Sequence, residues 1–168
     1  MIDLYAELKV LLRTLDVAGI PYALCGGLAL MVYQRPRATV DIDLILPAEA
    51  TGKCIQALKP LGFRAHPRPM RLEASGVEIQ RFYKLEEGGP DVLMLDCLLT
   101  THPLVAEAWQ GRVRVPFDAG TAWVVSLAGL IVLKRLRGSP LDLVDIEGLE
   151  ALVDQPPEDS PGSDHGCP

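Results

Sequence analysis

Residues 25–46, CGGLALMVYQRPRATVDIDLIL, contain the pattern that decides the fold of this 168-residue chain. A short apolar run ends at the glycine pair Gly26 and Gly27, and a helical pattern follows it. Beyond the next loop, an apolar strand carries two aspartates, Asp41 and Asp43. A glycine pair lets the backbone turn tightly and approach a ligand, and N–H groups at a helix start can receive phosphate oxygens. The order predicts a phosphate-binding turn beside an acidic strand; the alternative is a plain turn.

The two aspartates alternate with apolar residues, and this alternation sets their direction. In a strand, residues i and i+2 point to the same face, so Asp41 and Asp43 share a face about 7 Å apart. Val40, Ile42 and Leu44 are then expected to point into a core. Like charges this close repel unless a cation lies between them, and Mg²⁺ prefers carboxylate oxygens. The pattern therefore predicts a divalent metal site; the alternative is a polar sheet face in water.

A third acid, Asp96, interrupts the apolar run of residues 92–99. A buried carboxylate is costly unless it is paired, hydrogen-bonded or bound to a metal. If this strand lies beside the one with Asp41 and Asp43, three carboxylates converge, and such a set can hold two metal ions for phosphoryl transfer. The alternative is that Asp96 marks a strand end or pairs with a buried arginine.

The remaining sequence alternates helical and strand patterns, which predicts an α+β domain over residues 1–153. We expect a mixed β-sheet flanked by helices, with two helices at the C-terminal end. Residues 154–168 are acidic and lack hydrophobic residues to bury, so they are predicted to be a disordered tail. The predicted helices cover residues 3–18, 28–34, 48–59, 103–109, 126–137 and 142–152, and the predicted strands cover residues 22–25, 40–46, 61–65, 77–85, 92–99 and 112–116.

Composition narrows the class of protein. The net charge of −6 argues against a protein whose main role is to coat nucleic acid. The four cysteines form no CxxC pair and have no histidine nearby to complete a zinc set. The longest apolar stretch, residues 123–133, is shorter than the roughly 20 residues of a membrane span, and the N-terminus has no signal-peptide pattern. We expect a protein of a reducing cytoplasm with no membrane partner.

These motifs resemble the signature of the nucleotidyltransferase superfamily typified by DNA polymerase beta. That signature is a Gly-Gly or Gly-Ser turn, a spacer, an Asp-hydrophobic-Asp-hydrophobic strand and a third acid on a later strand. The resemblance places the phosphate-binding glycines on Gly26 and Gly27, the metal-binding pair on Asp41 and Asp43, and the third carboxylate on Asp96. Because Gly27 stands where many members have serine, backbone N–H groups would have to bind the phosphate there.

Further residues look like small bacterial nucleotidyltransferases akin to AbiEii-type toxins. They are the R-x-T-x-D-I-D-L form, which includes Arg37 and Thr39, and the later segment with Lys134. The resemblance implies a nucleoside triphosphate such as ATP and a Mg²⁺ cofactor, with Mn²⁺ as a substitute. It implies that Arg37 reaches phosphates, that Thr39 supports the metal loop and that Lys134 meets the triphosphate. The alternatives are a solvated loop cation for Arg37 and a helix-end charge favoured by the dipole for Lys134.

The leading functional hypothesis is a Mg²⁺-dependent enzyme that transfers a nucleotidyl group from a nucleoside triphosphate to a hydroxyl of an RNA, a protein or a small molecule. One alternative is a non-catalytic partner protein of this fold in a toxin–antitoxin-like pair. Another is a metal-dependent nuclease, which would leave the glycine turn unexplained. A basic rim for RNA, or else scattered surface charge, is formed by His66, Arg68, Arg71, Arg112 and Arg114.

Overall fold

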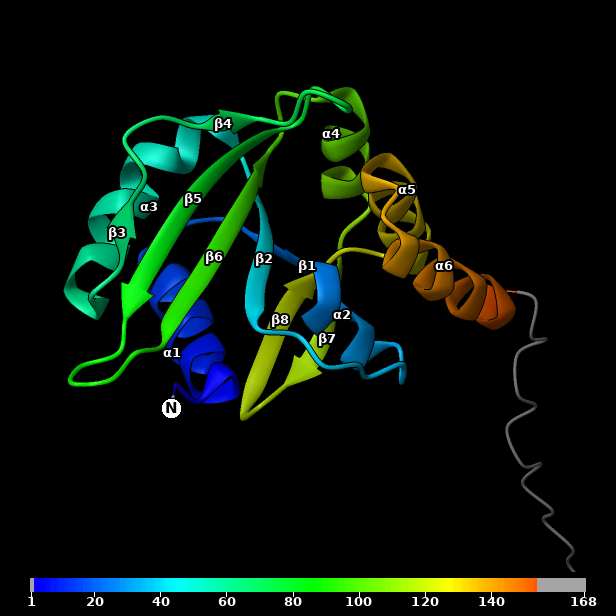
Figure 1. Ribbon diagram of the computed structural model, residues 1–168. Coiled ribbons are helices and arrows are strands. Elements are labelled where there is room, and N and C mark those ends of the chain that lie inside the picture. The colour runs from blue at the N-terminus through cyan, green and yellow to red at the C-terminus, as the bar shows by residue number, and fades with distance from the viewer. Residues whose placement is uncertain (1, 154–168) are drawn as a thin grey trace, which may run out of the picture.

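The computed structural model describes residues 2–153, and a mixed β-sheet organises them (Figure 1). In chain order the elements are α1 (Leu4–Val17), β1 (Ala23–Cys25), α2 (Gly26–Val32), β2 (Asp41–Leu46), η1 (Ala48–Ala50), α3 (Thr51–Leu58), η2 (Lys59–Leu61), β3 (Arg64–Ala65), β4 (Met70–Arg71), β5 (Glu78–Leu85), β6 (Val92–Leu99), α4 (Pro103–Gln110), β7 (Val113–Phe117), β8 (Gly120–Val124), α5 (Leu127–Arg137) and α6 (Pro140–Val153).

Eight strands within the described residues form one sheet in the order β3-β5-β6-β2-β1-β8-β7, with β4 paired to β5 beside this path. The pairs β2–β6 and β1–β8 are parallel, and the other pairs are antiparallel. The predicted α+β class with a mixed sheet is therefore confirmed. None of the helices between residues 2 and 153 combines the length and the apolar character needed to cross a membrane.

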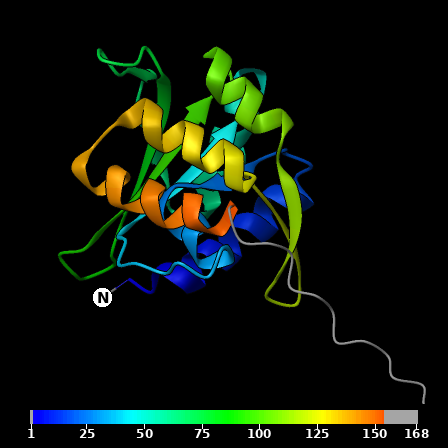
Figure 2. The ribbon, with the colours of Figure 1, turned by 90° about the vertical axis from the view of Figure 1, so that its right-hand side faces the viewer.

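Helices cover the two faces of the sheet separately. Cys97 lies on the buried face of β6 and faces Cys54 of α3, which is buried as well. Because neighbouring strand residues point to opposite faces, α3 covers the face opposite to Asp96. The leucines of α1 recur at helical spacing and pack in the same core, and α1 contacts α3. On another side of the molecule, α5 and α6 lie next to each other in front of the sheet (Figure 2).

One local prediction was wrong, two strands were missed, and one prediction lies outside the described residues. Val40 is 77% exposed and not in the core, because β2 begins only at Asp41. The strand β8 was missed because its residues merge in the sequence with the apolar run of α5; its pairing with β1, Leu24 opposite Val124, is what defines it. The short strand β4 was missed too. The predicted tail, residues 154–168, falls outside the described part of the chain.

Candidate active site

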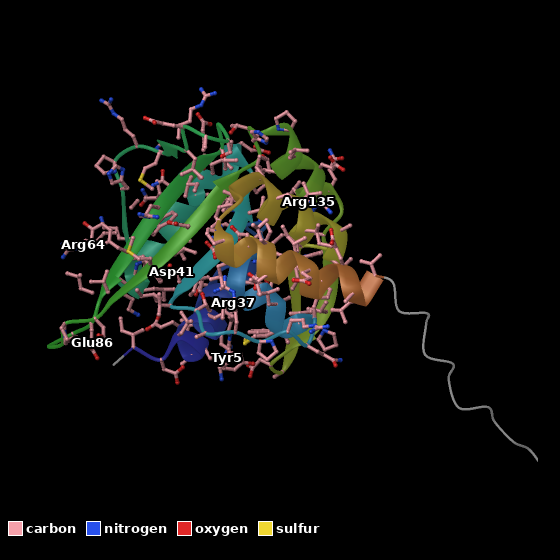
Figure 3. The ribbon with its side chains drawn as sticks, turned by 45° about the vertical axis from the view of Figure 1, so that its right-hand side comes forward. Tyr5, Arg37, Asp41, Arg64, Glu86 and Arg135 are labelled. Carbon is pink, nitrogen blue, oxygen red and sulfur yellow. The ribbon has the colours of Figure 1, made fainter. Side chains whose placement is uncertain are left out.

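The three predicted carboxylates come from two neighbouring strands. β2 and β6 pair in parallel, and their register places Asp43 opposite Asp96. Asp41 lies two residues earlier on the same face of β2, while Ile42 and Leu44 between and after the aspartates are fully buried on the other face. Figure 3 shows Asp41 on the side of the sheet where α6 lies. The predicted convergence of the acidic strands is confirmed.

The glycine turn fits closely around Asp43. Gly26 has φ +63, and a Cβ at this position would come within 2.0 Å of Asp43 Oδ2. The backbone N–H of Gly27 faces the same aspartate and lowers its pKa. A Cβ on Gly27 would lie 2.8 Å from Thr39 Oγ1, which explains why a serine does not fit here. The two predicted phosphate-binding glycines therefore hold Asp43, and Thr39 packs on this turn and hydrogen-bonds the carbonyl of Asp41 at 3.5 Å.

A Gly26→Ala variant is expected to lose metal-dependent nucleotide binding, because the new Cβ displaces the Asp43 carboxylate. The positive φ adds a penalty of about 1–2 kcal/mol to the free energy of unfolding. Gly88→Ala is the matched control, since Gly88 has φ +73 but a Cβ there meets nothing within 4 Å. Urea unfolding should show the backbone penalty in both variants and a further cost in Gly26→Ala from the contact with Asp43, whereas calorimetric nucleotide binding should be lost in Gly26→Ala alone. Equal nucleotide binding by the two variants would contradict the role assigned to this turn.

The electrostatics of the carboxylates favour a cation beside them. Burial and the charge of Asp96 raise the pKa of Asp43 to about 6, although Arg137 and the Gly27 N–H oppose the shift. Burial and Asp96 also raise the pKa of Asp41. The negative charges on this face are therefore under-compensated, and a divalent cation would relieve their repulsion.

Asp96 also has a protein partner that sequence reasoning missed. Arg81 lies opposite Asp96 on β5 and binds both carboxylate oxygens, with both N–O distances at 2.7 Å. The predicted alternative, pairing with an arginine, is thus confirmed, except that Arg81 is partly exposed. Half of the residues of β5 are polar or charged, so Arg81 did not stand out in the sequence as Asp96 does in the apolar strand β6.

The donor set fits Mg²⁺ when groups from outside the chain complete the shell of the ion. Within residues 2–153, no three Asp, Glu, His or Cys side chains are arranged as a ready-made metal site, and Asp96 is held by Arg81. Mg²⁺ is usually bound by only one or two carboxylates, with substrate phosphates and water completing its shell. Asp41 and Asp43 meet that requirement.

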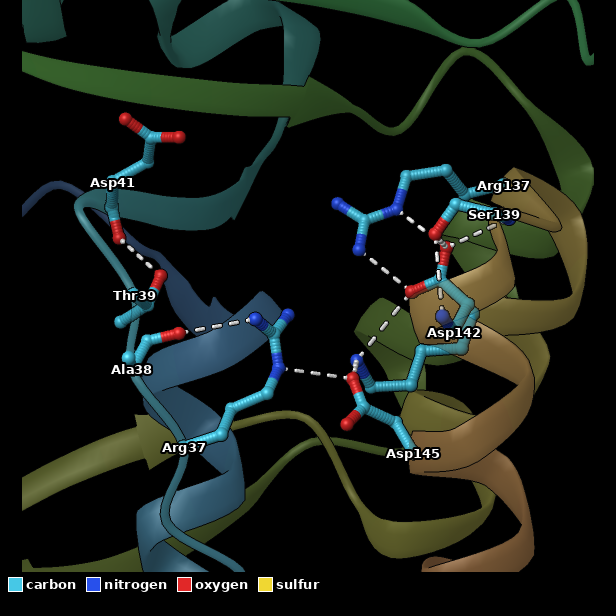
Figure 4. Close-up of polar contacts among 9 residues, drawn as sticks. Arg37, Ala38, Thr39, Asp41, Arg137, Ser139, Asp142 and Asp145 are labelled. Carbon is cyan, nitrogen blue, oxygen red and sulfur yellow. Dashed lines mark hydrogen bonds and ion pairs between the residues drawn. The ribbon is translucent and has the colours of Figure 1, made fainter.

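The predicted cations Lys134 and Arg37 share one partner, Asp145 of α6. Figure 4 shows the contact between Arg37 and Asp145. Lys134 Nζ donates to Asp145 Oδ2 at 2.6 Å, and Arg37 Nε donates to the same oxygen at 3.1 Å. Lys134 is only 3% exposed and lies 3.6 Å from Asp142 Oδ1. Both cations line a cleft but are paired, so they connect the loop before β2 and α5 to α6.

Arg137 is a further cation of the site that the sequence did not single out. It donates two hydrogen bonds to Asp142, at 2.7 and 2.6 Å, and Asp142 also accepts from Ser139 (Figure 4). Its side chain is half-exposed, and its charge lowers the pKa of Asp43, which places it near the carboxylates. In the sequence, Arg137 is an ordinary cation in the last turn of a helix, where it suits the helix dipole. The sequence therefore contains no sign that Arg137 also lies near the carboxylates.

These groups border one cleft of about 670 Å³. Its polar lining combines the carboxylates, the four cations and the turn, and the rest is largely apolar. Arg112 and Arg114 of the expected basic rim lie elsewhere, with Arg112 stacked 3.8 Å from the Trp109 ring centroid. The lining residues are Cys25, Gly26, Arg37, Ala38, Thr39, Val40, Asp41, Asp43, Leu72, Ser75, Val77, Ile79, Arg81, Asp96, Leu98, Leu130, Leu133, Lys134, Leu136, Arg137, Ser139, Leu141 and Asp142.

Solved structures of nucleotidyltransferases share this fold. The crystal structure of ANT(2'')-Ia with adenylyl-2''-tobramycin has a TM-score of 0.59 and 19% identity, over 89% of this chain and 88% of that one. The lincomycin-bound lincosamide antibiotic adenylyltransferase LnuA has a TM-score of 0.54 and 16% identity, over 88% of this chain and 96% of that one. At these identities the likeness establishes the fold. No protein-family model matches the sequence, and no curated protein matches it.

Proposed function

We propose that this chain is a metal-dependent nucleotidyltransferase that moves the nucleotidyl group of a nucleoside triphosphate onto a hydroxyl group. The observation that carries the proposal is the register of β2 and β6, which places Asp43 beside Asp96 at the glycine turn, and both acids line the cleft. Two acids on one strand, a third on its neighbour and a backbone turn around them match the nucleotidyltransferase signature that the sequence resembles, and the fold is shared with solved nucleotidyltransferases.

In this proposal Asp41 and Asp43 hold Mg²⁺, or Mn²⁺ in its place. The bound ion would offset the triphosphate charge and lower the pKa of the attacking hydroxyl. Arg137, held by Asp142, presents a cation to the phosphates. Lys134 and Arg37 fix the helical wall of the cleft through Asp145. Asp96, oriented by Arg81 through two hydrogen bonds, is placed beside Asp43 to accept the proton of the acceptor.

A small molecule is the acceptor class that the site supports best. The two nucleotidyltransferases of similar fold are described with an antibiotic or its adenylyl adduct, and this chain matches most of their length. RNA would require several cations for its backbone phosphates besides Arg137, which this proposal assigns to the triphosphate. Among the described residues, each cation that lines the cleft has a carboxylate partner, and the residues of the expected basic rim do not line it. The AbiEii-like resemblance and a partner protein remain predictions.

The transfer reaction is tested with radiolabelled triphosphates. The chain is incubated with Mg²⁺, each of the four nucleoside triphosphates and three acceptor sets: small hydroxyl compounds, bulk RNA and protein. A label on the α-phosphate should enter the acceptor fraction, and a label on the γ-phosphate should leave as pyrophosphate. The control variant is Asp118→Asn. It changes a surface carboxylate that pairs with Lys9 and does not line the cleft, so it should transfer the label as the wild type does. If the chain neither transfers the label nor binds a triphosphate in the presence of Mg²⁺, the proposed enzyme activity is refuted.

A further inference from the structure

The cleft has an apolar half that the nucleotidyl-transfer chemistry does not use. Leu98 follows Asp96 by two residues and so lies on the same face of β6, about 7 Å further along. Ile79 of β5 lies opposite Leu98 and extends this surface. Leu72 and Leu141 line the same cleft from the loop after β4 and from α6, and both are exposed. An apolar surface therefore begins at Leu98, two residues beyond Asp96 on the same face of β6.

The charged side chains that line the cleft are already paired or assigned to the metal, so few of them are left to bind a charged acceptor. Among residues 2–153, the lining cations are engaged by Asp96, Asp142 and Asp145. The lining carboxylates without a lysine or arginine partner are Asp41 and Asp43, which the metal requires. A polycationic acceptor would find no further carboxylate to bind, and a polyanion would find no further cation. Because unpaired charges are costly to desolvate, this half of the cleft favours an uncharged ligand.

We propose that the acceptor is an uncharged small molecule with an apolar body, which lies on the surface formed by Leu72, Ile79, Leu98 and Leu141 and presents one hydroxyl to Asp96. This proposal rests on the proposed function and names its substrate class. The cleft volume of about 670 Å³ lies in the range of small-molecule sites. Transfer would form a phosphodiester bond to the acceptor oxygen, release pyrophosphate and pass the hydroxyl proton to Asp96.

Two glycosides that differ only in the length of their alkyl chain show how much the apolar chain adds to the binding affinity. Methyl and octyl β-glucoside are titrated into the full chain by NMR, below the micelle concentration, with and without Mg²⁺ and a non-hydrolysable ATP analogue. The octyl compound should bind at least about tenfold more tightly, since each buried methylene favours binding. Equal affinities would overturn the proposal, as would tighter binding of spermine or of oligo(A) than of octyl glucoside.

Two leucines on the first turn of α6 provide matched variants. Leu141 lines the cleft and is 49% exposed, whereas Leu143 is 62% exposed and does not line it. Leu141→Gln should weaken octyl glucoside binding about threefold and leave methyl glucoside unchanged, and Leu143→Gln should change neither. Equal effects of the two variants would overturn the proposal.

The outcome also separates this proposal from the proposed function. If the nucleotide analogue binds with Mg²⁺ but the alkyl tail adds no affinity, the acceptor class is wrong and the transferase stands. If the tail adds affinity but the nucleotide does not bind, the transferase is wrong and the preference of the cleft for an apolar ligand stands.

Discussion

Asp43→Asn is expected to reduce nucleotidyl transfer by at least about 10³-fold while it stabilises the metal-free protein. Metal-ion catalysis contributes several kcal/mol to a transition state, and each 1.36 kcal/mol is a factor of ten in rate. Asparagine keeps the shape of the side chain but removes the charge that a divalent cation requires. Transfer of an α-phosphate label, measured at saturating Mg²⁺, gives the loss directly.

The same substitution has an opposite, pH-dependent effect on stability without metal. The folded-state pKa of Asp43 is raised to about 6 from an ordinary 3.8, by burial and by Asp96. Its contribution to stability is therefore complete below pH 3.8 and is lost as the pH rises through 6. At pH 8 the variant should be more stable than the wild type by about 2 kcal/mol, less than the full shift implies because Asp43 retains some access to solvent.

Urea unfolding at pH 4 and pH 8, with and without Mg²⁺ and nucleotide, tests two expectations: the higher stability of the metal-free variant at pH 8 and its lack of a response to the metal. The difference between variant and wild type should vanish near pH 4. At pH 8, added Mg²⁺ with nucleotide should stabilise the wild type and leave Asp43→Asn unchanged. The control Asp118→Asn, at an exposed carboxylate beside Lys9, should behave like the wild type at both pH values and respond to Mg²⁺ with nucleotide as the wild type does. A Mg²⁺ response in Asp43→Asn equal to that of the wild type would place the metal elsewhere.

Asp142→Ala is expected to destabilise the fold by about 3–5 kcal/mol, because it removes one partner of a buried ionic network. Asp142 is 0% exposed and accepts hydrogen bonds from Arg137 and from Ser139. The variant leaves Arg137 without its carboxylate, and the buried Lys134 retains only Asp145. Loss of the Arg137–Asp142 ion pair should also raise the KM for the triphosphate, since Arg137 is no longer held at the cleft.

The control variant lies on the same pair of helices. Glu150 of α6 pairs with Arg135 of α5 at the surface, where the side chains are 46% and 61% exposed. Glu150→Ala should therefore cost no more than about 1 kcal/mol. Chemical denaturation of both variants makes the comparison, and a cost for Asp142→Ala as small as that for Glu150→Ala would show that the buried network does not hold the helices together.

The network of Asp142 also predicts the direction of an acid effect. Burial alone would raise the pKa of Asp142, but hydrogen bonds from Arg137 and Ser139 outweigh it and hold the pKa well below its usual value. The stabilisation from this carboxylate is consequently present above the usual aspartate pKa and is lost as the pH falls through the lower folded-state value. Acid unfolding of the wild type should therefore be steeper than that of Asp142→Ala.

The sequence by itself determined the features that depend on local chemistry. Alternation of acids and apolar residues placed Asp41 and Asp43 on one face of a strand, and helical spacing with Gly138 at its end defined α5. The glycine pair predicted a tight turn, and the positive φ of Gly26 agrees with it. These features follow from residue periodicity and backbone sterics, which act within a few residues of the chain.

Only the tertiary structure decided which of these features meet. The register that brings Asp96 to Asp43 joins strands far apart in the chain, and no periodicity in either strand contains it. Arg81 and Arg137 follow ordinary local rules, and their places beside the carboxylates depend on the pairing of β5 with β6 and on how α5 packs. Long-range pairing depends on the summed burial of the whole core, so the carboxylate face was predictable from the sequence while its cationic partners and apolar half were not.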